Sequence, residues 1–489
     1  MDLSERLTEK YEAVIGLEVH VQLSTVSKAF SADSASFGNQ PNSNISVVSL
    51  GLPGALPQTN EAMVKNAVKL GLALNCEINQ HHFFDRKNYF YADLPKGYQI
   101  TQDNQPICQK GYIIVKLGKS ERKVALNRIH IEEDAGKSIH DLHETYSYID
   151  LNRAGVPLLE VVSEPVIKSA EEAAAYFSEL RKIVRYLEIC DGNLEEGSMR
   201  CDANISVRLK GETKLGKRCE VKNLNSIKNL QRAIEYEIKR QINLLEKGEE
   251  IEQNTLNFDA LTGITTPLRS KEMANDYRYF PEPDLQPMYI SDDYILEIKK
   301  QMPLLPNELE ELFINEFSLT EYDAMILTAE KNTALYFMEL AKHTKNYKAC
   351  ANWILGPIKS YLNVTGKSIT DLNIAASKIA LIINMVDDGA INYSQAKEHV
   401  FDALIKDKDL DIYEFAKYHD ILIKTDNGEL ELCIDSVLSI FADKVAQYHQ
   451  GKKGLLGLFM GEIMKKTKGK IDPKTANKIL LEKIDNLKS

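Results

Sequence analysis

The sequence predicts an α+β protein, in which a domain built on a largely antiparallel sheet with helices comes first and helical domains follow. Short alternating or apolar runs, separated by Gly, Pro and Asn turns, fill residues 11 to about 165. Helical periodicity dominates after about residue 295. The composition changes near the same point, because all fourteen arginines and eleven of the fifteen prolines precede residue 290.

The first predicted strand lies within YEAVIGLEVHVQLST, residues 11–25. Its apolar residues share one parity, whereas Glu18 and His20 share the other, so the two polar side chains lie on the same strand face. A carboxylate and an imidazole at this spacing can share a metal ion or a proton. An ordinary solvated strand face is the alternative interpretation of this stretch alone.

Three helices are predicted to follow within the first domain. One covers 60–74, and a second begins at Ser169, where Ser169 and Glu172 form a capping box. The third covers about 226–247 and ends at Gly248, after a second group of strands at roughly 196–222. Runs of strands with helices added later are typical of α+β domains.

The remaining chain is predicted to be helical, with cap-like starts at Thr320 and Asp371 and a stop at Gly389. We predict three domains, at 1–294, 295–405 and 406–489. From residue 451 to the end, ten lysines face four acids, a local charge of +6 in a chain of net charge −11. Such a patch can contact phosphates, and a solvated lysine-rich helix face is the alternative.

Several classes of protein are disfavoured. No apolar run reaches the length of a membrane span, and the polar N-terminus has no signal-peptide core, which predicts a cytoplasmic protein without a membrane partner. The seven cysteines are scattered without a CxxC pair, which argues against a disulfide framework or a structural zinc site. The sequence has no GxxxxGK[ST] loop, no GxGxxG after a strand and no GxSxG elbow.

Four acidic clusters stand out within the first domain. They comprise Glu18 with His20; His130, Glu132, Glu133 and Asp134; Glu160 and Glu164; and Glu195, Glu196, Asp202 and Asn204. Carboxylates with a histidine suit magnesium, which prefers oxygen ligands and commonly uses nucleotide phosphates to complete its shell. Zinc is the weaker choice because no thiol occurs in these clusters. Surface charge is the alternative for each cluster taken separately.

A basic and aromatic stretch, FDRKNYFYADLPKGYQITQ at 84–102, complements the acids. Arg86 and Lys87 can neutralise a triphosphate, and the tyrosines can stack on a base or pack in the core. EVKNLNS at 220–226 and DYRYFPEPD at 276–284 repeat the pattern of one cation, nearby amides and an acid. The residues alone therefore predict a magnesium–phosphate site without identifying the substrate.

Together these stretches resemble the B subunits of bacterial-type aspartyl/glutamyl-tRNA amidotransferases (GatB). The resemblance rests on VIGLEVHVQL, FDRKNYFYADLPKGYQITQ, RIHIEEDAGKS, LNRAGVPLLEVVSEP, EEGSMRCDANISVR, KNLNS and DYRYFPEPDLQP, in this order and over nearly the whole length. Residues 451–480 are similar to the YqeY-type tail of these subunits.

The resemblance implies a ligase reaction. The B subunit uses ATP and Mg²⁺ to phosphorylate the side-chain carboxylate of Glu-tRNA(Gln) or Asp-tRNA(Asn). Ammonia released from glutamine by an amidase A subunit then displaces the phosphate, and a small C subunit holds A and B together in a heterotrimer. The implied partners are these subunits and misacylated tRNA, with no DNA.

Residues are assigned by matching family positions. The metal-binding and catalytic positions match Glu18, His20, Glu133 and Glu160, with Glu132 and Glu164 as neighbouring candidates. The nucleotide-binding candidates are Arg86, Lys87, Asp202, Asn204, Arg208, Lys222 and Asn223. The tRNA elbow is expected to contact Lys452, Lys453, Lys465, Lys466 and Lys468. Some members bind zinc in the loop after the first strand, but residues 27–44 contain no cysteine here, so we expect no zinc.

Two alternatives remain open. One is an RNA-binding scaffold whose acidic clusters are structural. The other is a metal-dependent phosphotransferase that acts on a small carboxylate without RNA; the basic tail and the resemblance argue against it, whereas motif spacing alone does not separate the two enzymes.

Overall fold

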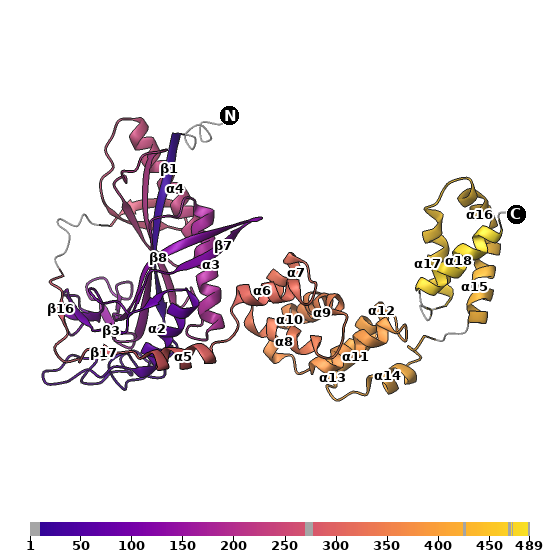
Figure 1. Ribbon diagram of the computed structural model, residues 1–489, viewed down its shortest axis with the longest axis horizontal. Helices are drawn as coiled ribbons and strands as arrows, with labels where there is room; N and C mark the ends of the chain where they lie inside the picture. Colours follow the sequence, from indigo (N-terminus) through magenta and orange to yellow (C-terminus); the bar gives the residue numbers. More distant parts are fainter. Residues whose placement is uncertain (1–9, 269–276, 424–426, 468–470, 472, 488–489) are drawn as a thin grey trace. The chain divides into compact units, whose positions relative to one another are not determined.

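The computed structural model describes residues 10–268, 277–423, 427–467, 471 and 473–487. The chain divides into two compact units, Met1–Pro306 and Asn307–Ser489 (Figure 1). The predicted boundaries at 294 and 405 remain predictions. None of the described helices combines the length and apolar character that crossing a bilayer requires.

A ten-stranded sheet organises the first unit. Its strands are β1 (Tyr11–Gln22), β2 (Glu77–Ile78), β6 (Cys108–Gln109), β7 (Tyr112–Leu117), β8 (Ser120–Glu133), β11 (Pro157–Ser163), β12 (Met199–Leu209), β13 (Cys219–Leu224), β14 (Thr255–Asp259) and β15 (Ile264–Pro267). They follow the order β15-β14-β13-β12-β1-β11-β8-β6-β2, with β7 paired to β8 off this path. All pairs are antiparallel except β13 with β14, so the predicted α+β class is confirmed.

Strand β1 lies in the middle of the sheet and has two different faces. Ile15, Leu17, Val19 and Val21 are 0% exposed and belong to the main hydrophobic core. The alternating side chains of Glu18 and His20 lie on the opposite face. The pattern read from the sequence is therefore the pattern that separates the core from the candidate site.

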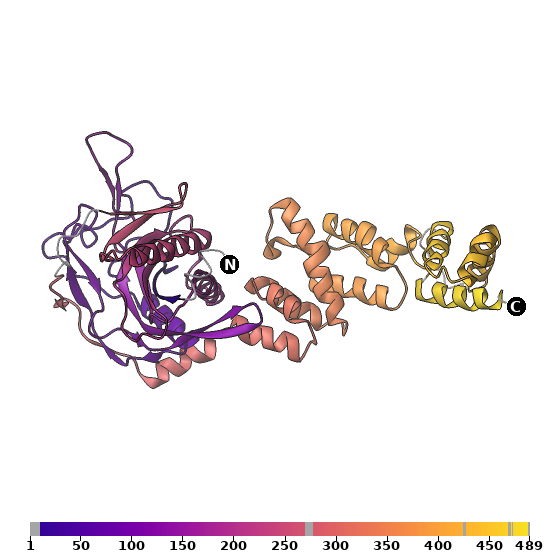
Figure 2. The same cartoon turned by 90° about the horizontal axis from the view of Figure 1, so that it is seen from above.

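Helices cover the apolar face of the sheet (Figures 1 and 2). They are α2 (Glu61–Ala73), α3 (Ala170–Tyr186) and α4 (Ile227–Glu246), and α5 (Asp292–Gln301) packs against α2. The predicted cap at Ser169 is observed, because its hydroxyl accepts from the Glu172 amide at 3.1 Å. The second half of the predicted capping box differs, because Glu172 Oε2 accepts from the Lys168 amide at 2.8 Å. Asn60 and Ser226, which the sequence analysis gave only as helix starts, cap α2 and α4. Gly248 follows α4 with a φ of 75°, a conformation that glycine adopts without strain.

Three small sheets border this core. They contain β16 (Phe280–Pro281), β4 (Asp85–Asn88) and β5 (Tyr98–Thr101); β10 (Tyr148–Asp150) and β9 (Lys137–Ile139); and β17 (Met288–Tyr289) and β3 (His81–His82). Strands β4 and β16 bring residues 85–86 beside residues 280–281, although nearly 200 positions separate them in the sequence.

Amide hydrogen bonds hold the loop that follows β1. The Asn42 side chain donates to the Ile149 carbonyl at 2.8 Å and accepts from the Leu151 amide at 2.8 Å. The Asn44 amide donates to Asn152 Oδ1 at 2.8 Å. These contacts attach residues 41–44 to β10 and to the segment that follows it.

The described part of the second unit is helical. Its elements are α6 (Pro306–Asn315), α7 (Glu321–Leu327), α8 (Lys331–Ala341), α9 (Tyr347–Trp353), η1 (Ile354–Ile358), α10 (Lys359–Thr365), η2 (Ile369–Asp371), α11 (Ala376–Asp387), α12 (Tyr393–Gln395), η3 (Ala396–Phe401), α13 (Asp402–Lys406), α14 (Ile412–Tyr418), α15 (Asn427–Ile440), α16 (Ala442–His449), α17 (Leu455–Lys466) and α18 (Pro473–Asn486). Residues Leu430–Ile484 contribute a hydrophobic cluster of their own.

The helix caps in this unit agree with the sequence at two positions and differ at one. Thr320 caps α7, and Gly389, with a φ of 69°, follows the end of α11. Asp371 does not start a helix. It closes the short 3₁₀ turn η2, where its carboxylate accepts from the Ser368 amide and hydroxyl at 2.9 and 2.6 Å, and α11 begins five residues later.

Candidate active site

The strand register aligns polar side chains in rows across the open face of the sheet. His20 on β1 lies opposite Glu160 on β11, and Glu160 lies opposite His130 on β8. In the next row, Glu18 lies opposite Asp202 on β12. Residues paired directly across strands have neighbouring side chains on the same face. Distant parts of the sequence therefore meet on one surface.

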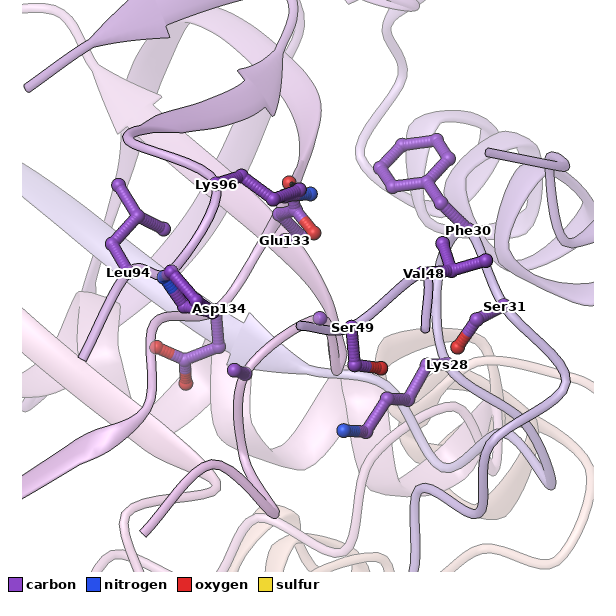
Figure 3. A pocket seen from close by; sticks show the side chains of 12 residues that line it. Lys28, Phe30, Ser31, Val48, Ser49, Leu94, Lys96, Glu133 and Asp134 are labelled. Atoms are coloured by element: carbon purple, nitrogen blue, oxygen red, sulfur yellow. Dashed lines mark hydrogen bonds and ion pairs between the residues drawn. The ribbon is translucent and has the colours of Figure 1, made fainter. Parts of the chain in front are cut away.

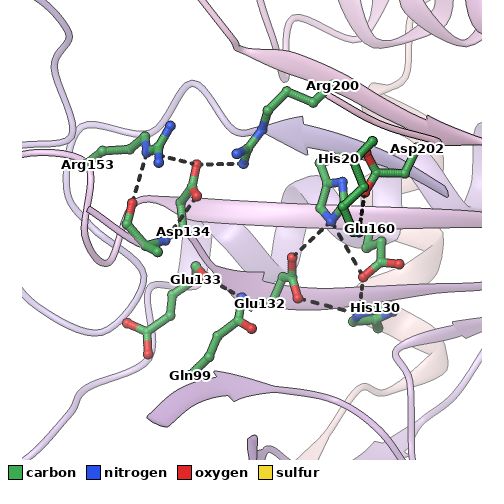
Figure 4. Close-up of polar contacts among 12 residues, drawn as sticks. His20, Gln99, His130, Glu132, Glu133, Asp134, Arg153, Glu160, Arg200 and Asp202 are labelled. Atoms are coloured by element: carbon green, nitrogen blue, oxygen red, sulfur yellow. Dashed lines mark hydrogen bonds and ion pairs between the residues drawn. The ribbon is translucent and has the colours of Figure 1, made fainter. Parts of the chain in front are cut away.

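The first acidic group contains His20, Glu132 and Glu160, whose ligand-type atoms lie within 4.8 Å of one another. His20 Nε2 is 3.6 Å from Glu132 Oε1 and 3.8 Å from Glu160 Oε2. Figure 4 shows both carboxylates turned toward His20, with His130 beside them. His130 Nε2 is 3.1 Å from Glu160 Oε2.

The buried charges in this group stabilise one another. Burial lowers the pKa of His130, but Glu160 and Glu132 outweigh it and raise that pKa to about 9. Burial raises the pKa of Glu160, but His130, His20 and Lys87 hold it well below its ordinary value. Each of the two groups therefore favours the charged form of the other.

The second acidic group contains Glu18, Asp202 and Glu220, again with ligand-type atoms within 4.8 Å of one another. Lys222 Nζ lies 2.9 Å from Asp202 Oδ2 and 2.5 Å from Glu220 Oε1, and the Asn204 amide donates to Glu18 at 2.8 Å. Burial and the nearby Glu160 raise the pKa of Glu18, because a second negative charge disfavours its ionised form.

Both groups line one cleft of about 290 Å³. Its wall also includes Lys87, Gln102, Asp103, Arg128, Tyr277 and Tyr279. The Lys87 ammonium lies 4.9 Å from the centre of the Tyr277 ring. The cleft thus combines an excess of carboxylates with cations and aromatic rings contributed by other segments.

Glu133 does not join these residues. Adjacent strand residues point to opposite faces, so Glu132 faces the cleft and Glu133 faces away from it (Figure 4). Its carboxylate forms an ion pair with Lys96 and accepts the Ile100 amide at 2.9 Å. Figure 3 shows Glu133 and Lys96 beside a separate small cavity of about 20 Å³. The expectation that Glu18, His20, Glu133 and Glu160 surround one ion therefore does not fit this geometry.

Lys28 lies beside this small cavity and supports a pH prediction. It is 1% exposed, donates to the Asn44 carbonyl at 2.7 Å, and burial lowers its pKa from 10.5 to about 8 despite nearby acids. At pH values between these two pKa values, Lys28 is protonated to a greater extent in the unfolded chain than in the folded one. The contribution of Lys28 to the free energy of unfolding should therefore rise with pH by roughly 3 kcal/mol across this range. Lys28→Met should remove this contribution, which denaturant titrations of both proteins on either side of this window would test; equal slopes would contradict it.

Several of the predicted nucleotide-binding and metal-binding candidates lie outside the cleft. Arg86 donates twice to Glu282 at 2.8 Å, because it points away from its neighbour Lys87 on β4. Arg208 pairs with Glu12 at 2.6 Å, six residues along β12 from Asp202. Glu164 accepts the Asn127 amide just beyond the end of β11. The side chain of Asn223 lies outside the described residues, as does Lys468.

The sequence analysis did not single out Glu220, Arg128 or Gln102 for the site. Glu220 appeared only as the first letter of EVKNLNS, and its proximity to Glu18 arises because β13 pairs with β12. Alternation starting at His130 would have selected Glu132 and Arg128, because residues 128, 130 and 132 share one strand face. Gln102 lies just after β5, and no sequence signal identified it.

Two family models match the chain and define its class. Residues 13–296 match the model described as the GatB/GatE catalytic domain. Residues 335–484 match the model described as the GatB domain. The cleft lies entirely within the part that matches the catalytic domain.

Full-length relatives identify the family more narrowly. The chain is similar to proteins named as the B subunit of aspartyl/glutamyl-tRNA(Asn/Gln) amidotransferase. It is 46% identical over 480 residues to that of Thermodesulfovibrio yellowstonii, covering 97% of this chain and 99% of the relative. It is 47% identical over 481 residues to that of Syntrophotalea carbinolica, covering 98% and 99%. The chain belongs to the family of aspartyl/glutamyl-tRNA(Asn/Gln) amidotransferase B subunits.

Proposed function

We propose that this chain activates the side-chain carboxylate of a misacylated tRNA, Glu-tRNA(Gln) or Asp-tRNA(Asn), by phosphorylation with ATP. In this proposal it works as an ATP-dependent carbon–nitrogen ligase subunit with glutamine as the amido donor. The observation that carries the proposal is that two acidic groups and Lys87 line one cleft. The names of the relatives, which specify aspartyl- and glutamyl-tRNA, support the substrate class.

The donor atoms fit divalent ions with hard ligands. Five of the six side chains in the two groups are carboxylates, and the sixth is the imidazole of His20. Their spread within 4.8 Å is close to the ~4.2 Å that separates opposite ligands around an ion with bonds of about 2.1 Å. We therefore propose His20, Glu132 and Glu160 as one set of ligands, and Glu18, Asp202 and Glu220 as the other.

Bound Mg²⁺ would neutralise negative charge on the phosphates of ATP. The chain's own residues would orient the reactants. Lys87, which forms no ion pair within the described residues, is placed to approach the phosphates, while Lys222 holds Asp202 and Glu220 in position. Phosphoryl transfer depends mainly on such positioning and charge stabilisation.

The proposed chemistry has two steps. A side-chain carboxylate oxygen bonds to the γ-phosphorus of ATP, the bond to the β-phosphate oxygen breaks, and ADP leaves. Ammonia then bonds to the acyl carbon, inorganic phosphate leaves, and the nitrogen loses a proton as the amide forms. The first step is needed because a carboxylate at neutral pH lacks a good leaving group.

The proposed complex also contains an amidase A subunit, which would supply ammonia, and a small C subunit. The second unit would hold the tRNA. Lys452, Lys453, Lys465 and Lys466 lie on or beside α17. Lys466 donates to Ser436 at 2.8 Å, Lys452 donates to Gln447 at 3.2 Å, and the Lys453 ammonium lies 4.0 Å from the centre of the Tyr448 ring. Lys465 is therefore the best candidate among these four for a phosphate contact.

Reconstitution tests the proposed function. The complete complex receives ATP, Mg²⁺, ammonium and misacylated tRNA, and the amide is measured on the recovered aminoacyl group. Amide formation that requires ATP and this chain is expected. If a complex carrying Glu160→Gln makes amide at the wild-type rate, the cleft is not the reaction site and the scaffold alternative is favoured.

A tail deletion tests the tRNA contact. Removing residues 406–489 should raise the KM for tRNA by about tenfold or more, while kcat with ammonia stays within a few-fold, because the deletion leaves the cleft intact. Steady-state kinetics of ammonia-dependent amide formation with the complete complex provide both constants. A loss confined to kcat would contradict tRNA binding by the tail.

A further inference from the structure

Two buried hydrogen-bond donors in the cleft have no acceptor among the described residues. Gln102 is 1% exposed, and its Oε1 accepts from the Ile107 and Ile131 amides at 3.1 and 3.0 Å. These bonds fix the side-chain amide, yet its Nε2 has no partner. Arg128 Nε is likewise buried without a partner. Buried polar groups are nearly always satisfied, so this pair requires an explanation.

The strand register places Arg128 across the cleft from an acidic group. Arg128 on β8 lies opposite Val162 on β11, and Val162 lies opposite Glu18 on β1. Strands are about 4.8 Å apart, so the backbones at Arg128 and Glu18 are separated by roughly 10 Å on the same face. Val162 lies between them and has neither a donor nor an acceptor in its side chain.

None of the described acids in the cleft accepts a hydrogen bond from Gln102 Nε2 or Arg128 Nε. Glu220 and Asp202 are engaged by Lys222, Glu18 accepts from Asn204, and Glu132 and Glu160 lie beside the histidines. Arginine presents a planar set of donors that matches carboxylates and phosphates in two-point contacts. A half-buried arginine whose Nε is buried without a partner, together with a fixed amide donor, therefore suits an oxyanion brought by a ligand.

We propose that Arg128 and Gln102 Nε2 bind the reacting oxyanion between them and the group Glu18, Asp202 and Glu220. This assignment rests on the proposed function and deepens it. The oxyanion is either the terminal phosphate of ATP or the side-chain carboxylate of the aminoacyl group, since each offers two oxygens that can accept a two-point contact from a guanidinium. Binding leaves each donor satisfied and places the oxyanion between the guanidinium and the proposed metal ligands.

The test uses the complete complex with four variants. Arg128→Ala removes the guanidinium, and Arg128→Lys keeps the charge without the planar donors. Gln102→Glu keeps the acceptor that holds the Ile107 and Ile131 amides but replaces the Nε2 donor with a negative charge. Arg218→Ala removes an exposed arginine before β13 and serves as the control for lost charge. ATP-dependent amide formation with ammonium gives kcat and the KM values for ATP and misacylated tRNA.

We expect Arg128→Ala and Gln102→Glu to lower kcat/KM by about 10²–10³-fold, and Arg218→Ala to match the wild type. Arg128→Lys should recover only part of the loss, and added guanidinium should partly rescue Arg128→Ala but not Arg218→Ala. A rise in the KM for ATP in these variants would show that the bound oxyanion is the terminal phosphate of ATP. If the variants no longer bind misacylated tRNA more tightly than uncharged tRNA, the bound oxyanion is the side-chain carboxylate.

Different results would overturn the proposed function and the assignment of Arg128 and Gln102 to the oxyanion. If wild-type complex forms no amide from ATP and ammonium, the proposed function is wrong. If the wild type forms amide, and Arg128→Ala and Gln102→Glu stay within twofold of it in kcat and both KM values, the oxyanion assignment alone is overturned. Rescue by guanidinium would also show that Arg128→Ala had folded.

Discussion

Glu132→Gln is expected to remove one of two bound Mn²⁺ ions and to lower ammonia-dependent amide formation by at least about 10²–10³-fold. The substitution keeps the size of the side chain and removes the charge that faces His20 at 3.6 Å. Mn²⁺ serves as the probe because carboxylate and imidazole ligands suit it and it can be counted by electron paramagnetic resonance.

Glu133→Gln provides the matched control, because this carboxylate is the next residue along the chain and faces away from the cleft. It should lose the ion pair with Lys96 and still bind both Mn²⁺ ions. The readout is metal binding, so it does not depend on any other role of Glu133. Loss of an ion in Glu133→Gln, with both ions retained in Glu132→Gln, would reverse the ligand assignment.

Glu220→Gln should remove the other ion and leave the first. Its carboxylate belongs to the group with Glu18 and Asp202, and it also holds Lys222 at 2.5 Å. Amide formation should fall by about 10²-fold or more, because both groups are proposed to act on one phosphoryl transfer. The measurement is Mn²⁺ stoichiometry together with the rate of amide formation.

Two comparisons sharpen this result. Glu212→Gln, an exposed acid in the loop after β12, should change neither the stoichiometry nor the rate. The double variant Glu132→Gln with Glu220→Gln should bind no Mn²⁺ in the cleft. Its fold-loss in rate should be much smaller than the product of the fold-losses of the two single variants, since the effects of groups that act together are not additive. Wild-type stoichiometry in Glu220→Gln would remove the second metal site from the account.

The sequence predicted the parts of the site that depend on one strand. Alternation along β1 placed Glu18 and His20 together and the apolar residues in the core, and the structure confirms this division. The strands, the caps at Ser169 and Thr320, and the change to helical periodicity after about residue 295 could be predicted for the same reason. Each depends on local spacing and on residues that favour one backbone conformation.

The parts of the site that depend on pairing between strands could not be predicted from the sequence. Asp202 was expected to contact the nucleotide, and only the register of β1 with β12 places it opposite Glu18. The choice between Glu132 and Glu133, and likewise between Arg86 and Lys87, depends on which face of a strand a residue occupies. A shift of one residue exchanges the two faces of a strand. The resemblance to the family therefore did not decide which of two adjacent residues faces the cleft.

Transfer of oxygen from the aminoacyl carboxylate to phosphate tests the central claim most directly. Misacylated tRNA with ¹⁸O in both oxygens of the side-chain carboxylate is incubated with the complete complex, ATP, Mg²⁺ and ammonium, and the released phosphate is examined by mass spectrometry. If this chain phosphorylates the carboxylate, one ¹⁸O atom should appear in phosphate for each amide formed, and Glu132→Gln should lower the rate of transfer by the same factor as the rate of amide formation. Amide formation that leaves the phosphate free of ¹⁸O would contradict the proposed function of the cleft.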